Sequence, residues 1–439
     1  MSLVSQDFDY KIDNEGSQGT CYRTTYPSES SGYGLGDRCL IQVPHTHNGF
    51  LNVQNSWLNL TMTVSGLTGT NVAGNGVDVH LSSIGAYSAI AQVNVISNST
   101  GYVQEIRNFQ QIMALLLAHN TDRATTLPGS IVSGTSVITG GQNVLGQIQN
   151  IAGSAIVKQD FSLPLIGLFG GRHIPIAFIN DNIMLEIIFT SDIRDILYTS
   201  AGSATTQITG GQVAFTAEYD ADVIIATDST ITKIRQASDI TNGIMSWSDT
   251  QIHAVNNNVT ISELNSAGRS FKQTLVGGVK PKQLLQVFHT GFGGARGCGD
   301  QWQQLVYWST EWRLRLGSQE YPPRFIHTMA EAQASLQDCF DSLAKTTYNS
   351  QVCLDTALAG SRQPASTTAQ ILTNNGASGY NFSKFYNTAD GVDTTGKQLI
   401  TEVDLLANGV AVNSINACTF KRFGVIYSIS DSGEFSVSY

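Results

Sequence analysis

Residues Gly101–Asn120 have the sequence GYVQEIRNFQQIMALLLAHN, in which apolar residues recur at steps of three and four. The recurring residues are Val103, Ile106, Phe109, Met113 and Leu116. This period places them on one face of an α-helix, so the stretch predicts an amphipathic helix. Strand-like segments precede it, and a stretch rich in Gly, Ser and Thr follows it.

A second helix is predicted about half a chain further on, at Ile326–Lys345 (IHTMAEAQASLQDCFDSLAK). Its apolar face is formed by Met329, Ala332, Leu336, Cys339 and Leu343. Thr328 and Glu331 have the spacing of a capping box, which satisfies free amides at a helix start. Because each helix follows a strand-rich block, the chain is predicted to contain a β-rich unit with one helix, present twice. Both helices are expected to cover a sheet or a barrel end.

Most other segments alternate apolar and polar residues with the period of two that is typical of β-strands. In Trp57–Val64 (WLNLTMTV), one face is formed by Leu58, Leu60, Met62 and Val64. Ile183–Phe189 (IMLEIIF) is apolar on both faces, as expected of a buried strand. Further strands are predicted at Val77–Leu81, Ala89–Ile96, Val213–Ile225, Leu284–His289, Leu305–Gly317, Lys397–Leu406, Thr419–Ile429 and Glu434–Tyr439.

Antiparallel strands at short spacing, with one helix in each unit, favour a sandwich or jelly roll over an alternating α/β sheet. The predicted fold is therefore all-β with two short helices, arranged as two tandem jelly rolls. Residues 226–243 are read as the connection between the halves. The predicted organisation is an N-terminal arm at 1–38, a first jelly roll at 39–235 and a second at 236–439. Pro322 and Pro323 are expected to end a strand before the second helix.

The composition points to an assembly subunit. The chain has 439 residues, of which 13% are charged, well below the roughly 25% of ordinary globular proteins. Such a chain covers its surface with neutral polar side chains or hides much of it against other chains. The net charge is −10, and the first twenty residues contain four acidic residues but only one lysine. No basic arm is present to neutralise phosphates, so direct nucleic-acid binding is not expected.

No apolar run approaches the roughly 20 residues of a membrane span, and no signal peptide is recognised. Without a secretory signal, reduced thiols are expected for the six cysteines, which lack paired metal-ligand spacing. They are Cys21, Cys39, Cys298, Cys339, Cys353 and Cys418. Cys339, on the apolar face of the second helix, is read as a small core residue.

Two pairs of residues are candidate sites. His45 and His47 form an H-x-H on a predicted strand, but a cupin-type metal site needs a carboxylate three or four residues later. Phe50 and Leu51 occupy those positions, so the histidines are read as surface or interface residues. Asp220 and Asp222 share one strand face and could bind calcium or act as acid and base, although a solvated strand edge is the preferred reading.

Two further stretches resemble binding motifs in part. The glycine run GFGGARGCG at Gly291–Gly299 has Arg296 in place of the last glycine of a dinucleotide-binding loop, and no helix pattern follows it. Arg313 and Arg315 are expected to face outward from a strand whose Trp312 faces inward. With Trp308 they could form a stacking surface for sugars or bases, but a solvated or inter-subunit basic edge is preferred. No catalytic, cofactor-binding or metal-ligating residue is therefore assigned, and no cofactor is expected.

The order of segments resembles the double jelly-roll major capsid proteins of icosahedral DNA viruses, and most of all those of polinton-like viruses and virophages. Four segments carry this resemblance: Pro44–Val64, with its strand pair; Ala86–Leu116, a strand, a glycine turn and a helix; Phe161–Phe189; and Leu314–Leu336, with its Gly-Ser followed by Pro. The resemblance spans nearly the whole chain.

The resemblance implies two eight-stranded jelly rolls, and a homotrimer whose six barrels form a pseudo-hexagonal capsomer, or hexon, of the virion shell. The implied partners are the chain itself, neighbouring capsomers, and penton and minor capsid proteins, and no enzymatic activity is implied. Assembly is expected inside the infected host cell, and contact with a membrane is left open. Two alternatives remain at this stage: a β-sandwich carbohydrate-binding or fibre protein, and a cupin-like enzyme.

Overall fold

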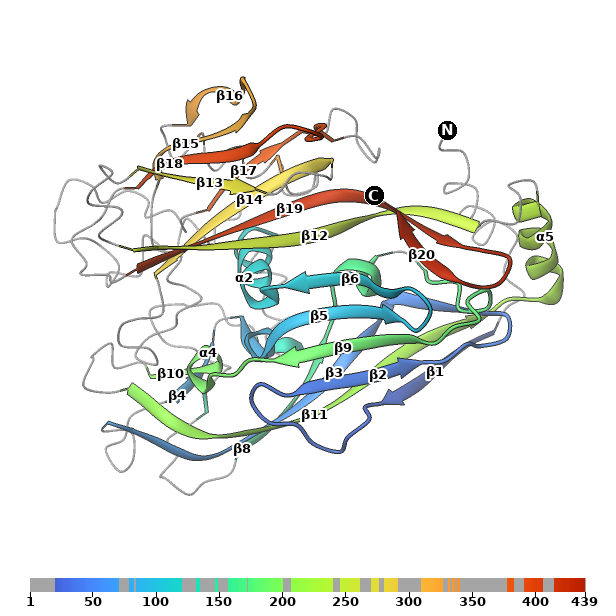
Figure 1. The fold of residues 1–439 in the computed structure, drawn as a ribbon. Coiled ribbons are helices and arrows are strands. Elements are labelled where there is room, and N and C mark those ends of the chain that lie inside the picture. Colours follow the sequence, from blue (N-terminus) through green and yellow to red (C-terminus); the bar gives the residue numbers. More distant parts are fainter. Residues whose placement is uncertain are drawn as a thin grey trace.

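The computed structural model describes residues 20–70, 79–82, 84–120, 132–134, 147–148, 157–171, 173–199, 207–239, 245–260, 270–275, 280–290, 309–326, 331, 334–335, 338–339, 377–382, 391–405 and 414–438. Within these residues the chain forms two β-rich units, called roll 1 and roll 2 below. In Figure 1, roll 1 is blue to green and lies below roll 2, which is yellow to red.

Roll 1 consists of two four-stranded antiparallel sheets around an apolar core. The first sheet has the strand order β1-β11-β3-β8, formed by Thr20–Pro27, Gln207–Ile225, Gly49–Thr70 and Val157–Leu163. The second has the order β2-β9-β5-β6, formed by Arg38–Val43, Ile183–Phe189, Ile90–Ser97 and Gly101–Arg107. A small additional sheet joins β10, β4 and β7 (Leu197–Thr199, Val79–Leu81 and Gln147–Ile148).

Roll 2 is built in the same way. Its first sheet has the order β12-β19-β14-β17, formed by Met245–Thr260, Ser414–Ile429, Pro281–Thr290 and Ala377–Asn381. The C-terminal strand β20 (Phe435–Ser438) also pairs with β19. The second sheet has the order β13-β18-β15-β16, formed by Ser270–Leu275, Leu399–Leu405, Ser309–Leu316 and Gln319–Ile326.

The two rolls share one connectivity. When the eight main strands of each roll are numbered in chain order, both rolls have sheets of order 1-8-3-6 and 2-7-4-5. This is the strand order of a jelly roll, in which successive strands cross between the two sheets. The predicted all-β fold of two tandem eight-stranded jelly rolls is therefore confirmed.

Strand alternation builds the cores as the sequence predicts. In β3, Leu58, Leu60, Met62 and Val64 are almost fully buried, and the polar residues between them lie on the outer face. Strand β9 occupies the predicted residues Ile183–Phe189.

The first predicted helix begins later than expected. Helix α2 spans Phe109–Asn120, whereas Gly101–Arg107 forms β6 and pairs with β5. Asn108 separates them: its φ is +54°, in the left-handed region, and its carbonyl accepts hydrogen bonds from the amides of Gln111 and Ile112.

 Asn108, with its left-handed backbone, ends the strand and starts the helix. Val103 and Ile106 are buried in β6, so the three- and four-residue steps there are not helical.

The second predicted helix is described only in part. Glu331, Ala334 and Ser335 are helical, and the Asp338 amide donates to the Ala334 carbonyl at 3.1 Å. The remaining residues of Ile326–Lys345 lie outside the described part of the chain, except Ile326, which ends β16, and Cys339, which lies in a turn and is buried.

The expectation that Pro322 and Pro323 end a strand is wrong. Both lie within β16, where the pairing with β15 shifts register between Trp312 and Leu314. Strand β16 is at the edge of its sheet, so a residue without an N–H group is tolerated there.

The predicted connection between the halves contains a helix that the sequence reading missed. Helix α5 spans Asp228–Asp239 and buries Ile231 and Ile234. The Thr227 hydroxyl accepts a hydrogen bond from the Thr230 amide at 3.4 Å, as in a helix N-cap. A short helix, α4 (Ile193–Ile196), and two 3₁₀ turns, η1 (Gly85–Ala89) and η2 (Gly167–Gly170), complete the described elements.

The described part of the predicted N-terminal arm includes a strand of roll 1. Strand β1 pairs with β11 along its whole length, from Thr20↔Ile225 to Pro27↔Glu218. Residues 1–19 lie outside the described part of the chain. The boundaries at residues 38 and 235 remain predictions.

Candidate functional site

The contact between the two rolls, called the seam below, is the candidate functional site. In Figure 1, α2 and β6 of roll 1 lie beneath β12 of roll 2. Gln251 on β12 donates to the Val103 carbonyl on β6 at 2.6 Å and to the Tyr427 hydroxyl at 3.1 Å. Further along β12, Asn256 donates to the Asn108 side chain at 2.8 Å. These bonds fix the position of β6 along β12.

Apolar side chains fill the seam. Leu285 and Phe420 on the first sheet of roll 2 are buried in the same core cluster as Ile112 and Leu115 of α2. Leu284, the neighbour of Leu285, belongs to a separate cluster inside roll 2. The sheet is therefore apolar on both faces, as expected of a sheet that is covered on both sides. Burying one such side chain contributes about 1.5–3 kcal/mol, so the seam joins the rolls firmly.

The C-terminal strand closes one end of the seam. Phe435 on β20 is fully buried and stacks on Trp247, with ring centroids 5.8 Å apart, and on Tyr427, at 5.7 Å. The Phe435 carbonyl accepts a hydrogen bond from the Thr100 hydroxyl of roll 1.

The turn before β20 also contacts roll 1. The Asn180 side chain donates to the Ser432 carbonyl at 2.8 Å, and the Asn180 amide donates to the Gly433 carbonyl at 3.0 Å. Gly433 has φ +77°, and a Cβ there would lie 2.5 Å from the Asn180 side chain. Glycine is thus required both by the backbone conformation and by the close approach of roll 1.

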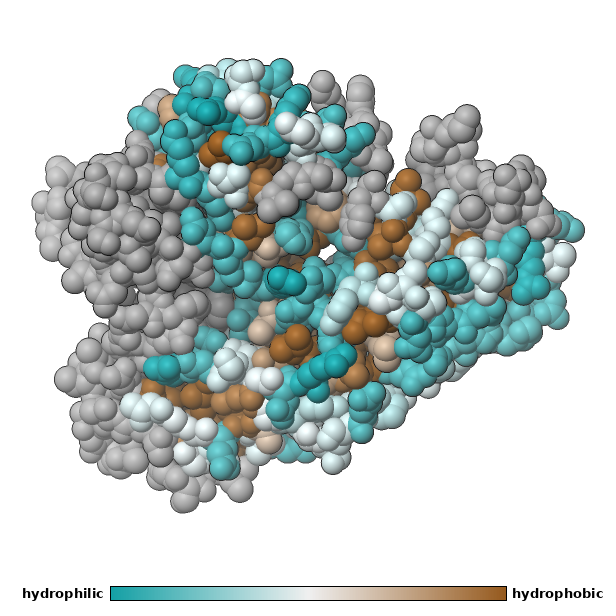
Figure 2. Space-filling view, viewed as in Figure 1, coloured by the Kyte–Doolittle hydropathy of each residue, from teal (hydrophilic) through white to brown (hydrophobic). Residues whose placement is uncertain are grey.

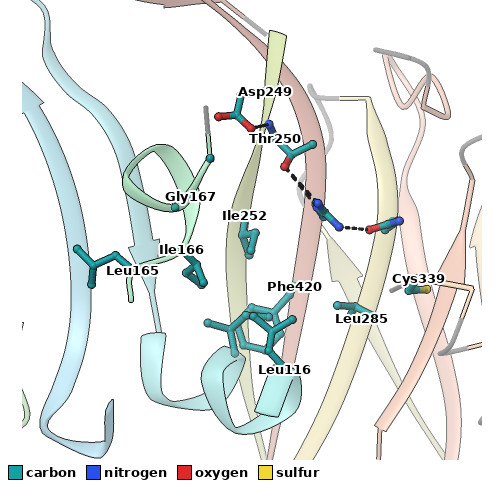
Figure 3. Close-up of a pocket in the computed structure, with 15 residues that line it drawn as sticks. Leu116, Leu165, Ile166, Gly167, Asp249, Thr250, Ile252, Leu285, Cys339 and Phe420 are labelled. Atoms are coloured by element: carbon teal, nitrogen blue, oxygen red, sulfur yellow. Dashed lines mark hydrogen bonds between the residues drawn. The ribbon is translucent and has the colours of Figure 1, made fainter. Parts of the chain in front are cut away.

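A cavity of about 470 Å³ lies in the seam. It is lined by Leu116 of α2 and the segment from Leu165 to Gly167 in roll 1, and by Ile252, Leu285 and Phe420 in roll 2 (Figure 3). Arg422 also lines the cavity, and its guanidinium donates to Gln283 at 3.1 Å and to Thr250 at 3.4 Å. Neighbouring side chains thus hold the Arg422 guanidinium in place. We therefore read the cavity as part of the packing between the rolls.

Each roll carries a buried glutamate on its seventh main strand, which lies in its second sheet. In roll 2, Glu402 is bound by Lys272 at 2.9 Å, Arg313 at 2.6 Å and Arg315 at 3.4 Å. Burial opposes ionisation, but the hydrogen bonds from Lys272 and Arg313 hold the pKa of Glu402 below its usual value. In roll 1, Glu186 is bound by Arg38 and Asn94. Both glutamates thus connect neighbouring strands of their sheets.

The arginine pair is placed as predicted, with Trp312 buried and Arg313 and Arg315 on the outer face. Arg313 also pairs with Glu320 at 2.9 Å and stacks on Phe325. These partners occupy its guanidinium, which leaves little of it for a sugar or a base. Trp308 and the glycine run at 291–299 lie outside the described residues.

The histidine pair is not on a strand. His45 and His47 lie in the segment between β2 and β3, and both are exposed. The His45 Nδ1 atom lies 3.0 Å from the Ile179 carbonyl oxygen. Among the described residues, no group of three or more His, Cys, Asp or Glu side chains could hold a metal ion.

The aspartate pair is not at a strand edge, because β11 lies between β1 and β3. Asp220 pairs with Arg23 at 3.5 Å, and Asp222 accepts from Asn52 at 2.9 Å. A register shift between Asp220 and Asp222 separates them. The two carboxylates are therefore half-buried structural groups with different partners.

The cysteines that the structure describes are free thiols: Cys21 is exposed, and Cys39, Cys339 and Cys418 are buried. Burial raises the pKa of Cys39 to about 11, so this thiol is protonated and unreactive at neutral pH. The reading of Cys339 as a core residue agrees with its burial. In the described part of the chain, no helix is long and apolar enough to cross a membrane.

No family model and no curated protein matches the chain. Solved structures do match it across nearly its whole length. PBCV-1 VP54, fitted into a reconstruction of the virophage Sputnik, has a TM-score of 0.61 at 11% identity, covering 96% of this chain and 97% of that one. The Sputnik virophage structure has a TM-score of 0.57 at 13% identity, covering 96% and 89%.

The mavirus major capsid protein is also similar, with a TM-score of 0.54 at 10% identity, covering 95% of this chain and 90% of that one. These neighbours are viral double jelly-roll major capsid proteins. Identities this low establish the fold alone. The chain therefore has the double jelly-roll fold of viral major capsid proteins.

Proposed function

We propose that this chain is a major capsid protein whose homotrimer forms a pseudo-hexagonal capsomer of an icosahedral DNA-virus shell. The observation that carries the proposal is the fusion of two rolls of identical strand order through an apolar seam. Two firmly joined rolls per chain give six rolls in a trimer, which is the number that a six-sided tile needs.

The composition supports a role in assembly. Only 13% of the residues are charged, and the net charge is −10. Neutral polar groups cost less to remove from water than charged groups, so such surfaces suit contacts between many copies. An acidic chain is also repelled by nucleic acid, which supports a shell that encloses DNA without binding a specific sequence.

The proposed location is the virion, after assembly in the infected host cell. The proposed partners are further copies of this chain, neighbouring capsomers, and penton and minor capsid proteins. The chain is proposed to have no enzymatic activity and no cofactor. Its rolls are proposed to span residues 39–235 and 236–439, with β1 added to the first.

Light scattering of the purified chain tests the proposal. A homotrimer has three times the chain mass of 47.2 kDa. A monomer at micromolar concentration, with no larger assembly under any condition, would overturn it. Stoichiometric metal in the purified chain would favour the cupin-like alternative, and selective binding on a glycan array would favour the carbohydrate-binding one.

A further inference from the structure

The edges of the two rolls lie side by side along β6 and β12. Gln251 on β12 donates to Val103 on β6, and Asn256 donates to Asn108, and the residues of both pairs are 148 positions apart in the sequence. Because the offset is the same at both contacts, the two strands run in the same direction along the seam. This offset identifies which residue of β6 lies beside each residue of β12 between the two contacts.

His253 lies on β12 between these contacts, and the same offset of 148 residues places it beside Glu105 of β6. Side chains alternate along a strand, so His253 shares the face of β12 from which Gln251 reaches roll 1. On the neighbouring strand β19, Lys421 is the register partner of His253. The half-buried imidazole therefore lies where β6 of roll 1 meets β12 and β19 of roll 2.

Cations outnumber anions around this imidazole. The charged groups that act on His253 are Lys421 of β19 and Arg107 and Glu105 of β6. The Glu105 carboxylate already accepts hydrogen bonds from Arg107 at 2.8 Å and from Gln92 at 2.9 Å. Helix α2, which follows β6, contains no aspartate, glutamate, lysine or arginine. A protonated imidazole would therefore meet two cations and a carboxylate that two other side chains already bind.

The hydrogen bonding of His253 also favours the neutral imidazole. Its Nδ1 atom is buried, and no group in the described part of the chain forms a hydrogen bond with it. A neutral imidazole can leave this nitrogen without a proton, whereas an imidazolium ion carries an N–H on both nitrogens. Protonation in the closed seam would therefore bury a donor that has no acceptor, which is costly inside a protein.

The apolar part of the seam does not depend on this imidazole. Figure 2 shows hydrophobic residues gathered between the rolls on the side that faces the viewer. Ile112 and Leu115 of α2 share a core cluster with Leu285 and Phe420 of roll 2. A proton does not change such contacts, so they hold the rolls together when the contact at His253 is lost.

We propose that His253 is an acid-sensitive switch in the seam: protonation of its imidazole parts β6 from β12, while the apolar contacts keep each roll folded. The parted strands take up the proton more readily than the closed seam, so a fall in pH shifts the equilibrium towards parting. This inference concerns a single chain and goes beyond the proposed capsomer. In a shell built from such chains, acidification loosens each subunit along its own seam.

Hydrogen exchange of the purified chain at about pH 7.5 and about pH 5, corrected for the intrinsic pH dependence of exchange, tests the switch. Protection of the β6 and β12 amides is expected to fall by about tenfold or more at the lower pH, the change in an equilibrium constant that one pKa unit produces. Protection of β3 and β11, within roll 1, should change by less than about twofold. His253→Gln should keep the seam protected at both pH values. His47→Gln is the matched control: His47 is exposed between β2 and β3, so this variant should behave as the wild type.

Arg107→Gln provides a second test that leaves the imidazole in place, so a folding defect in His253→Gln leaves the proposal testable. The Arg107 side chain is 59% exposed, so the fold should tolerate its replacement. The change removes one cation and releases Glu105 to bind the imidazolium ion, so the loss of protection at low pH is expected to shrink. No loss in the wild type, an equal loss in either variant, or a loss that spreads over β3 and β11 would overturn the proposal. A chain that forms no trimer would instead overturn the proposed function.

Discussion

The Trp312 indole N–H donates a hydrogen bond to the Gln286 side-chain oxygen at 2.8 Å, and both side chains are fully buried between the two sheets of roll 2. The Gln286 amide also donates to Gln273, Thr401 and Thr419, at 2.9, 3.0 and 3.1 Å. Gln286 lies on the first sheet, and Trp312 lies on the second. The network therefore links the two sheets through polar groups inside an otherwise apolar core.

Gln286→Leu is expected to lower the free energy of unfolding by about 2 kcal/mol. Leucine fills a similar volume but leaves the buried indole N–H without an acceptor, which costs about 1–3 kcal/mol. Urea denaturation measures the change. Adding Trp312→Phe removes the indole N–H that lacks an acceptor. The free energy of unfolding of the double variant should therefore fall by less than the sum of the two single decreases. Fully additive losses would contradict the account.

Phe435→Ala is expected to destabilise the chain by about 3–5 kcal/mol, the usual cost of truncating a buried phenylalanine. The loss should appear at the seam, since Phe435 packs on Trp247 and its carbonyl binds Thr100 of roll 1. Hydrogen exchange should therefore quicken in β6 and β12. Ser438→Ala, at an exposed position on the same strand, is the control and should change neither quantity.

Stability should decrease as the pH falls below 6.5, because of His253. Burial, and then the positive charges of Lys421 and Arg107, lower the pKa of this histidine from its ordinary value of 6.5, while Glu105 opposes them. The unfolded chain therefore takes up a proton first, so the stabilisation is complete above pH 6.5 and is lost as the pH falls through the folded pKa.

His253→Gln should flatten this part of the pH dependence. The test measures urea midpoints for the wild type and the His253→Gln variant at several pH values between about 7.5 and about 5. His253 lies on β12, between the seam residues Gln251 and Asn256. An equal decline in both proteins would show that other groups cause the acid sensitivity.

Glu402→Gln is expected to lower the free energy of unfolding by about 2 kcal/mol at neutral pH, within the range for hydrogen bonds to charged groups. The change leaves Lys272 and Arg313 without their shared carboxylate. Thermal unfolding checks the loss, and Glu218→Gln, at an exposed position, is the control. Because the pKa of Glu402 is lowered, the difference should be present above its unfolded value of 4.5 and disappear as the pH falls through the folded pKa.

Much of the fold could be predicted from local patterns. The alternation in β3 and the continuous apolar run of β9 follow from side chains that point to opposite faces of a strand. The same rule failed at Gly101–Arg107, where Val103 and Ile106 are three residues apart and Gln104 between them is also buried. A buried polar residue on an edge strand removed the alternation that would have indicated β6.

The seam could not be predicted, because its contacts join residues far apart in the chain. Gln251 and Val103 are 148 residues apart, and Thr100 and Phe435 are 335 apart. The partners of Arg313 were missed for the same reason, since Glu402 lies 89 residues away. The alternation along a strand indicates which of its residues face inward. It does not indicate which strand of another sheet those residues will contact.

Electron microscopy of the purified chain tests the central claim most directly. The account predicts particles with a six-sided outline that contain three chains and six rolls. Two-lobed particles of a single chain at every concentration examined would contradict it.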